Sequence, residues 1–80
     1  MDESDLIESP LEREVTRDGL TVRICIYRGS TEDGWILEVE DHEGGSTVWN
    51  DRFATDRAAL NEAIRTIETD GIGSFTVTQR

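Results

Sequence analysis

The sequence predicts one small α+β domain, with an antiparallel β-meander of about four strands, one amphipathic helix packed on one face, and a short C-terminal strand (β-β-β-β-α-β). Three observations support this fold class. The pair Asp18-Gly19 separates two stretches in which apolar and polar residues alternate, as in a β-hairpin. Clusters of glycine and acidic residues then divide the chain into further short segments. After Thr55 the apolar spacing changes to i, i+3, i+4, i+7, which is typical of a helix.

The N-terminus differs in composition from the rest of the chain. Residues 1–18 contain seven acidic and two basic side chains but only five apolar residues, whereas residues 19–80 contain 23 apolar residues. A segment with high charge and few apolar side chains cannot bury enough surface to fold. We therefore expect residues 1–10 to form a disordered acidic tail and residues 11–80 to form the domain.

The first hairpin follows from a type I′ turn, which needs positive φ angles at both central residues and so favours Asp-Gly. Counting outward from Asp18-Gly19 places apolar pairs on one face and opposite charges on the other. The predicted cross-strand pairs are Arg17 with Leu20, Val15 with Val22, Glu14 with Arg23, and Leu11 with Ile26.

The second hairpin joins the strand at residues 20–28 to the strand at 35–40 through a polar loop at residues 29–34. Its predicted pairs are Ile24 with Val39, Ile26 with Leu37, Arg23 with Glu40, and Tyr27 with Ile36. A further turn at residues 41–46 precedes a strand at residues 47–53, in which Trp49 and Phe53 face the core and Val48 lies on the opposite face.

The helix begins at Thr55 or Asp56, either of which is a suitable N-cap, and ends at Gly71. Its predicted core-facing residues are Ala59, Leu60, Ala63, Ile64 and Ile67. The alternation at residues 75–78 predicts the short last strand.

Charge and targeting signals exclude several classes of protein. The formal net charge is −10, and all eight basic residues are arginine, which argues against the basic type of nucleic-acid-binding domain. Two explanations for the absence of lysine stay open, namely GC-rich codon usage and adaptation to a salt-rich cytoplasm. The N-terminus lacks the positive charge and apolar run of a signal peptide, and no apolar run is long enough to span a bilayer. We expect a cytoplasmic protein with no membrane contact.

No motif predicts chemistry, so we expect no enzyme, no catalytic residue, no cofactor and no metal. The acidic turn around His42 has metal-ligating residue types, but neighbouring turn positions diverge. The run Glu32-Asp33-Gly34 lacks the acidic spacing of a calcium loop. Cys25 lies mid-strand beside glutamates, which disfavour the thiolate, and Gly71-Ile72-Gly73 follows a helix rather than preceding one.

The sheet face away from the helix provides the candidate site. Tyr27 and Ile36 are paired there, and Val48 lies on the next strand. A charged row flanks them, in which Arg23 lies between Glu14 and Glu40 on the neighbouring strands. These are either scattered surface residues or a small apolar patch rimmed by charge, as at a protein interface. The candidate interface residues are Tyr27, Ile36, Val48 and Arg23.

The order of the elements, with the runs Trp35-Ile36-Leu37-Glu38-Val39 and Ala58-Ala59-Leu60-Asn61-Glu62-Ala63-Ile64, resembles small HicB-like domains. The layout is equally like that of other small bacterial proteins. The similar stretch runs from Thr21 to Glu68, with Asp41-His42-Glu43-Gly44 in place of the family's Pro-Gly turn. The resemblance implies a partial double-stranded-RNA-binding-like fold and an antitoxin that acts by protein contact.

From the residues themselves, we expect a non-enzymatic protein-interaction module whose partner is another protein or a second copy of the chain, as a homodimer. The alternative is an antitoxin-like or nucleic-acid-mimicking acidic partner of a basic protein, which the net charge suggests. In neither case do we expect direct contact with nucleic acid.

Overall fold

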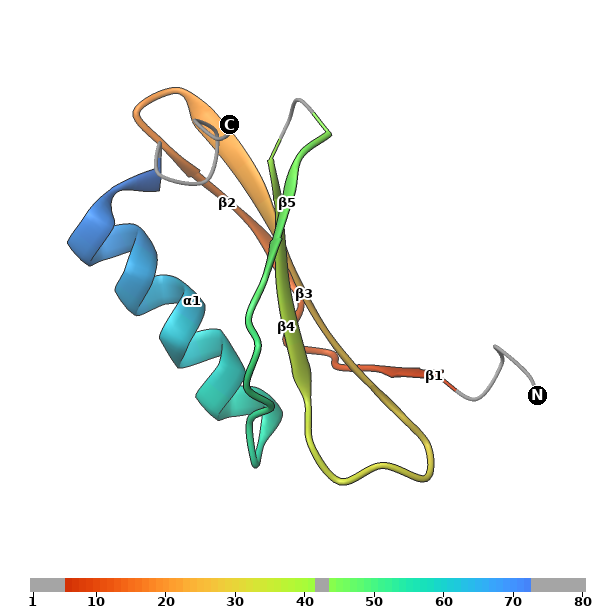
Figure 1. Ribbon diagram of the computed structural model, residues 1–80. Helices are drawn as coiled ribbons and strands as arrows, with labels where there is room; N and C mark the ends of the chain where they lie inside the picture. Colours follow the sequence, from red (N-terminus) through yellow and green to blue (C-terminus); the bar gives the residue numbers. More distant parts are fainter. Residues whose placement is uncertain (1–5, 42–43, 73–80) are drawn as a thin grey trace.

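A computed structural model describes residues 6–41 and 44–72 of the chain. Within these residues, five strands form one antiparallel sheet, and a single helix lies across one face of it (Figure 1). This arrangement confirms the predicted α+β class. The elements are β1 (Leu6–Glu8), β2 (Arg13–Arg17), β3 (Leu20–Gly29), β4 (Ile36–Asp41), β5 (Ser46–Val48) and α1 (Asp56–Asp70).

The long strand β3 organises the sheet, because β1 and β2 both pair with it along one edge while β4 pairs along the other. The strand β5 extends the sheet beyond β4. The register between β3 and β4 confirms the predicted second hairpin, with Ile24 opposite Val39, Ile26 opposite Leu37, Arg23 opposite Glu40, and Tyr27 opposite Ile36.

The first hairpin is confirmed near its turn and wrong farther from it. Asp18 and Gly19 have φ angles of 56° and 80°, as a type I′ turn requires. The pairs Arg17–Leu20, Val15–Val22 and Glu14–Arg23 all form. The predicted pair Leu11–Ile26 does not form, because the edge strand is interrupted at residues 9–12.

Residues 6–8 correct the prediction of a disordered tail over residues 1–10. They form β1, in which Leu6, Ile7 and Glu8 lie opposite Gly29, Arg28 and Tyr27. Backbone pairing with β3 needs no apolar side chains, so composition did not reveal this strand. Residues 1–5 lie outside the described residues.

The core lies between the sheet and α1. Its buried side chains come from β2, β3, β4, α1 and Ile72, with Leu11, Leu20, Trp35, Trp49, Phe53 and Ile64 packed around them. The predicted helix face is confirmed, with Ala59 and Ala63 fully buried against the sheet. Thr55 is the N-cap, since its hydroxyl accepts a hydrogen bond of 3.0 Å from the amide of Ala58. Gly71, at a φ angle of 87°, ends the helix as predicted.

The strand predicted at residues 47–53 is shorter than expected. The strand β5 ends at Val48, and pairing resumes only at an isolated bridge between Trp35 and Phe53. The side chains of Trp49 and Phe53 still pack against the core, as predicted. The last strand predicted at residues 75–78 lies outside the described residues.

Among residues 6–41 and 44–72, no helix has the length and apolar content that a membrane span requires.

Candidate functional site

The helix occupies only one side of the sheet, and we call the opposite side the outer face (Figure 1). The strand register defines which side chains lie there. One row across the sheet contains Cys25, Glu38 and Val48, and the next contains Tyr27 and Ile36. The outer face is therefore where the structure places the candidate interface predicted from sequence.

The structure brings two of the four predicted interface residues into direct pairing. Tyr27 lies opposite Ile36, and both are half-buried. Val48 lies one row away, opposite Glu38, and is 52% exposed. Arg23 lies on the same face in the row of Glu40. These placements agree with the counted register, and the role of the four residues as an interface stays a prediction.

A groove of about 370 Å³ lies on the outer face, and we call it the outer groove. Its lining residues come from β1, the β1–β2 connection, β3 and β4: Leu6, Glu8, Glu12, Arg23, Cys25, Tyr27, Glu38 and Glu40. In Figure 1, β1 extends away from the sheet on the side opposite α1. This strand forms one wall of the groove, and side chains of β3 and β4 form its floor and its other wall.

The interruption of the edge strand at residues 9–12 gives β1 a different direction from β2. Four residues, 9–12, lie opposite only two residues of β3, 25–26, because Glu8 pairs with Tyr27 and Arg13 with Ile24. The extra residues form a bulge, which bends an edge strand. A backbone hydrogen bond of 3.3 Å from the amide of Glu12 to the carbonyl of Ser9 closes a turn over the bulge.

Two side chains replace the backbone hydrogen bonds that the bulge removes. The carboxylate of Glu12 accepts a hydrogen bond of 2.8 Å from the amide of Ile26, a buried residue. The hydroxyl of Ser9 accepts one of 2.9 Å from the amide of Leu11 and donates one of 2.8 Å to Asp56 on α1. The bulge therefore has defined contacts to both the sheet and the helix.

The outer groove has an excess of negative charge, since four carboxylates and one guanidinium line it. Glu38 accepts a hydrogen bond of 2.9 Å from the hydroxyl of Tyr27. Arg23 lies between Glu14 and Glu40 by register, as predicted. Within the described part of the chain, however, no ion pair of 4.0 Å or less joins Arg23 to either glutamate.

The groove environment raises the pKa of two titratable groups on its floor. Partial burial, followed by the charges of Glu40 and Glu12, raises the pKa of Cys25 to about 11. Burial, followed by its hydrogen bond to Glu38, raises the pKa of Tyr27 to about 12. Both groups are therefore protonated at neutral pH, and the Cys25 thiol lacks the thiolate character of a nucleophile.

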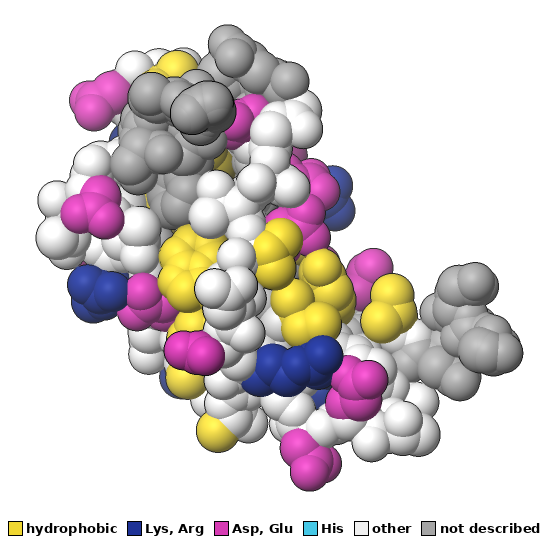
Figure 2. Space-filling view, viewed as in Figure 1, with side chains coloured by type: hydrophobic (Ala, Val, Ile, Leu, Met, Phe, Trp, Pro, Cys, Tyr) yellow, Lys and Arg dark blue, Asp and Glu magenta, His cyan; other side chains and the backbone are white. Residues whose placement is uncertain are grey.

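Apolar side chains are exposed beside the groove. Leu6 is 54% exposed on β1, and Val48 is 52% exposed on β5. Figure 2 shows hydrophobic side chains gathered across the middle of the molecule, from the helix side toward β1, with charged side chains below them. The outer face thus has exposed Leu6 and Val48 beside the carboxylates that line the groove.

The acidic turns are the other places where the residue types could support chemistry. No group of three or more histidine, cysteine or acidic residues among residues 6–41 and 44–72 is placed to hold a metal ion. His42 and Glu43 lie outside that part of the chain. Glu32 forms an ion pair of 2.6 Å with Arg52, which links its loop to the segment before α1.

Sequence reasoning missed the groove wall, namely Leu6 and Glu8 on β1 and Glu12 in the bulge. The run Ser9-Pro10 carried a usable signal. Serine is favoured at the first position of a β-turn and proline at the second, and serine also bonds the amide two residues on. Reading it as a turn would have predicted a strand on each side of it.

Comparison of the chain with protein-family models, with curated proteins and with solved structures finds no match. The resemblance to HicB-like domains therefore stays a prediction, and the case for function rests on the outer face itself.

Proposed function

We propose that this protein is a non-enzymatic protein-interaction module that binds its partner through the outer face of the sheet. The observation that carries the proposal is the combination of exposed Leu6 and Val48 with a groove floored by half-buried Tyr27. Exposed apolar side chains next to a charged border are the usual composition of a protein interface. The interaction takes place in the cytoplasm in this proposal, because the single free cysteine fits a reducing compartment.

An enzymatic function has less support. An enzyme would need an acid–base pair or an activated nucleophile, and the raised pKa values of Cys25 and Tyr27 oppose both uses at neutral pH. An interaction module needs only accessible surface with suitable shape and charge. The outer face supplies that surface, with Leu6 on β1, Tyr27 on β3, Ile36 on β4 and Val48 on β5.

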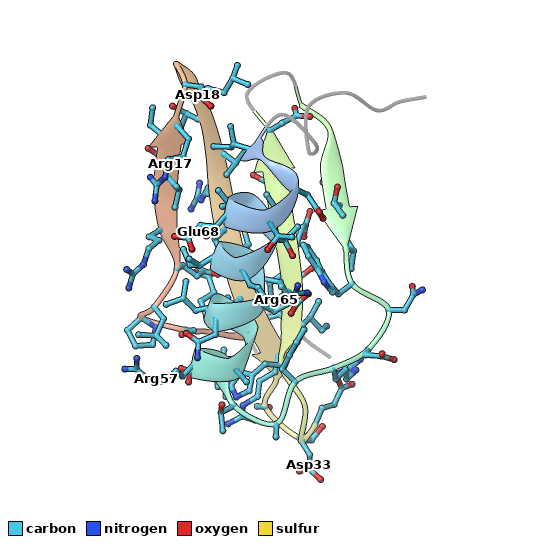
Figure 3. The ribbon with its side chains drawn as sticks, turned by 90° about the vertical axis from the view of Figure 1, so that its left-hand side faces the viewer. Arg17, Asp18, Asp33, Arg57, Arg65 and Glu68 are labelled. Carbon is cyan, nitrogen blue, oxygen red and sulfur yellow. The ribbon has the colours of Figure 1, made fainter. Side chains whose placement is uncertain are left out.

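Site-directed photo-crosslinking tests the proposal. A photoreactive amino acid replaces Val48 or Ile36 on the outer face, or Arg57 on α1 as the control. Arg57 is exposed and lies on the opposite side of the molecule, where Figure 3 shows it at the helix surface. We expect discrete cross-linked proteins from the two outer-face positions and none of them from Arg57.

Equal cross-linking from all three positions, or none from the outer face, would contradict the proposal. Sedimentation of the wild type and of Ile36→Glu then identifies self-association. A dimer that dissociates in the variant would mean that the partner is a second copy of this chain.

A further inference from the structure

We infer that the outer groove binds an extended segment of another protein that carries arginine or lysine side chains beside an apolar one. This inference rests on the proposed function and adds the chemistry of the partner. It follows from the charges in the groove, from which carboxylates lack a partner, and from the apolar wall on β1.

The charge of the groove is more one-sided than that of the chain. Four carboxylates and one guanidinium line it, whereas the whole chain has 18 acidic and 8 basic residues. Fields from like charges add in a concave surface, which attracts a ligand of the opposite sign. The groove therefore favours a cationic occupant.

Two of the four carboxylates are available to a ligand. Glu12 is used by the amide of Ile26, and Glu38 by the hydroxyl of Tyr27. The side-chain carboxylates of Glu8 and Glu40 have no hydrogen bond or ion pair with any described residue, and both residues are exposed. They lie on different strands, Glu8 on β1 opposite Tyr27 and Glu40 on β4 opposite Arg23. These partners are four residues apart on β3, so an extended segment along the groove would meet the two carboxylates with two separate cations.

The groove also offers apolar contact. Leu6 on the β1 wall is 54% exposed, and the half-buried Tyr27 side chain lies on the floor. The flat side of a tyrosine ring is a favourable neighbour for an arginine or lysine side chain. A segment with alternating basic and apolar residues would place one type toward the carboxylates and the other toward Leu6.

A second copy of this chain fits the groove poorly. A symmetric dimer with its two-fold axis through the groove would bring the four carboxylates of one copy against those of the other. Like charges brought together at an interface oppose association. The raised pKa values of Cys25 and Tyr27, to which these carboxylates contribute, agree with a negative potential over the floor.

The test uses a synthetic fluorescent peptide of alternating arginine and leucine, titrated with the full chain and followed by fluorescence anisotropy. Two matched peptides replace all arginines by glutamate or all leucines by serine. We expect saturable binding of the first peptide, weaker binding of the serine peptide, and none of the glutamate peptide. Binding should weaken with added salt, because salt screens exposed charges.

The variant pair Glu8→Gln/Glu40→Gln is the decisive comparison. Its matched control is Asp33→Asn/Glu68→Gln, which removes the same charge at two exposed sites away from the groove, labelled in Figure 3. We expect the groove variant to raise the dissociation constant of the arginine–leucine peptide by about three- to tenfold, and the control by less than about twofold. Urea unfolding should show that both variants keep the stability of the wild type.

Three outcomes would overturn the inference. Equal loss of affinity in the groove variant and its control would mean unspecific attraction to the net charge. A free polyamine that binds as tightly as the peptide would mean a site for small cations. Absence of peptide binding, with outer-face cross-links retained, would leave the proposed function intact and reject a basic partner.

Discussion

The hydroxyl of Ser9 donates a hydrogen bond of 2.8 Å to the carboxylate of Asp56, and this bond joins the β1–β2 bulge to the first residue of α1. Ser9 is only 4% exposed although it lies in a turn of the edge strand. The contact spans 47 positions in the sequence. It relates the direction of β1, and hence the wall of the outer groove, to the position of the helix.

The Ser9→Ala variant should be destabilised. It removes the donor to Asp56 and the acceptor of the Leu11 amide in a buried position, so the free energy of unfolding should fall by about 1–3 kcal/mol. Urea unfolding measures the loss. The control Ser30→Ala, at an exposed loop position, should change it by less than about 0.5 kcal/mol. Equal stability of the two variants would show that the contact is not significant.

Glu12 should protect the backbone amide of Ile26. The Glu12→Ala variant leaves this amide without its carboxylate acceptor, and we expect its hydrogen exchange to accelerate by at least about tenfold. Exchange followed by NMR measures this one amide. Glu14→Ala is the control, because Glu14 is exposed and bonds no amide among the described residues. Unchanged exchange in Glu12→Ala would argue against the bulge geometry.

Stability should decline in alkaline solution. The pKa of Cys25 rises from 9.0 to about 11 in the folded protein, so the unfolded chain loses this proton first as the pH rises. The unfolded state then binds fewer protons, and the free energy of unfolding falls between pH 9.0 and about 11.

Urea unfolding across this pH window gives the measurement, with Cys25→Ser as the matched variant. The fall should be smaller in Cys25→Ser, which keeps only the contribution of Tyr27, whose pKa rises from 10.0 to about 12. A wild type whose stability stays level or increases through the window would contradict the placement of the thiol.

Thr55 should contribute to stability as the N-cap of α1. Thr55→Ala removes the acceptor of the Ala58 amide and should lower the free energy of unfolding by about 1 kcal/mol, whereas Thr55→Ser keeps the hydroxyl. Thermal unfolding of both variants measures the difference. Thr31→Ala, at an exposed loop position, is the control and should leave stability unchanged. A loss of similar size in Thr55→Ser would point to a cause other than the hydroxyl.

The sheet register could be predicted wherever a turn type determined it. The pair Asp18-Gly19 allows only a narrow choice of turn, and the alternation of apolar residues on either side selects one register, since a slip by one residue would expose the core side chains. The same alternation placed Tyr27 opposite Ile36 in the second hairpin. Helix boundaries were predictable too, because Thr55 and Gly71 carry strong capping preferences.

The candidate site was only half predictable. Tyr27, Ile36, Val48 and Arg23 were placed on the outer face by counting along strands. Leu6, Glu8 and Glu12 were not, because the counted hairpin assumed an unbroken edge strand. The bulge at residues 9–12 is stabilised by contacts to Ile26 and Asp56, which are distant in the sequence.

By itself, then, the sequence determined the fold class, the register of the second hairpin, that of the first hairpin near its turn, and the helix with its caps, since each depends on local turn chemistry and on apolar periodicity. Only the tertiary structure decided that the acidic N-terminal segment contributes a strand at Leu6–Glu8, because that strand forms through backbone pairing to β3. The outer groove depends on both. The alternation along β3 and β4 places the side chains of its floor, and the bulge, which contacts the distant residues Ile26 and Asp56, positions the β1 wall.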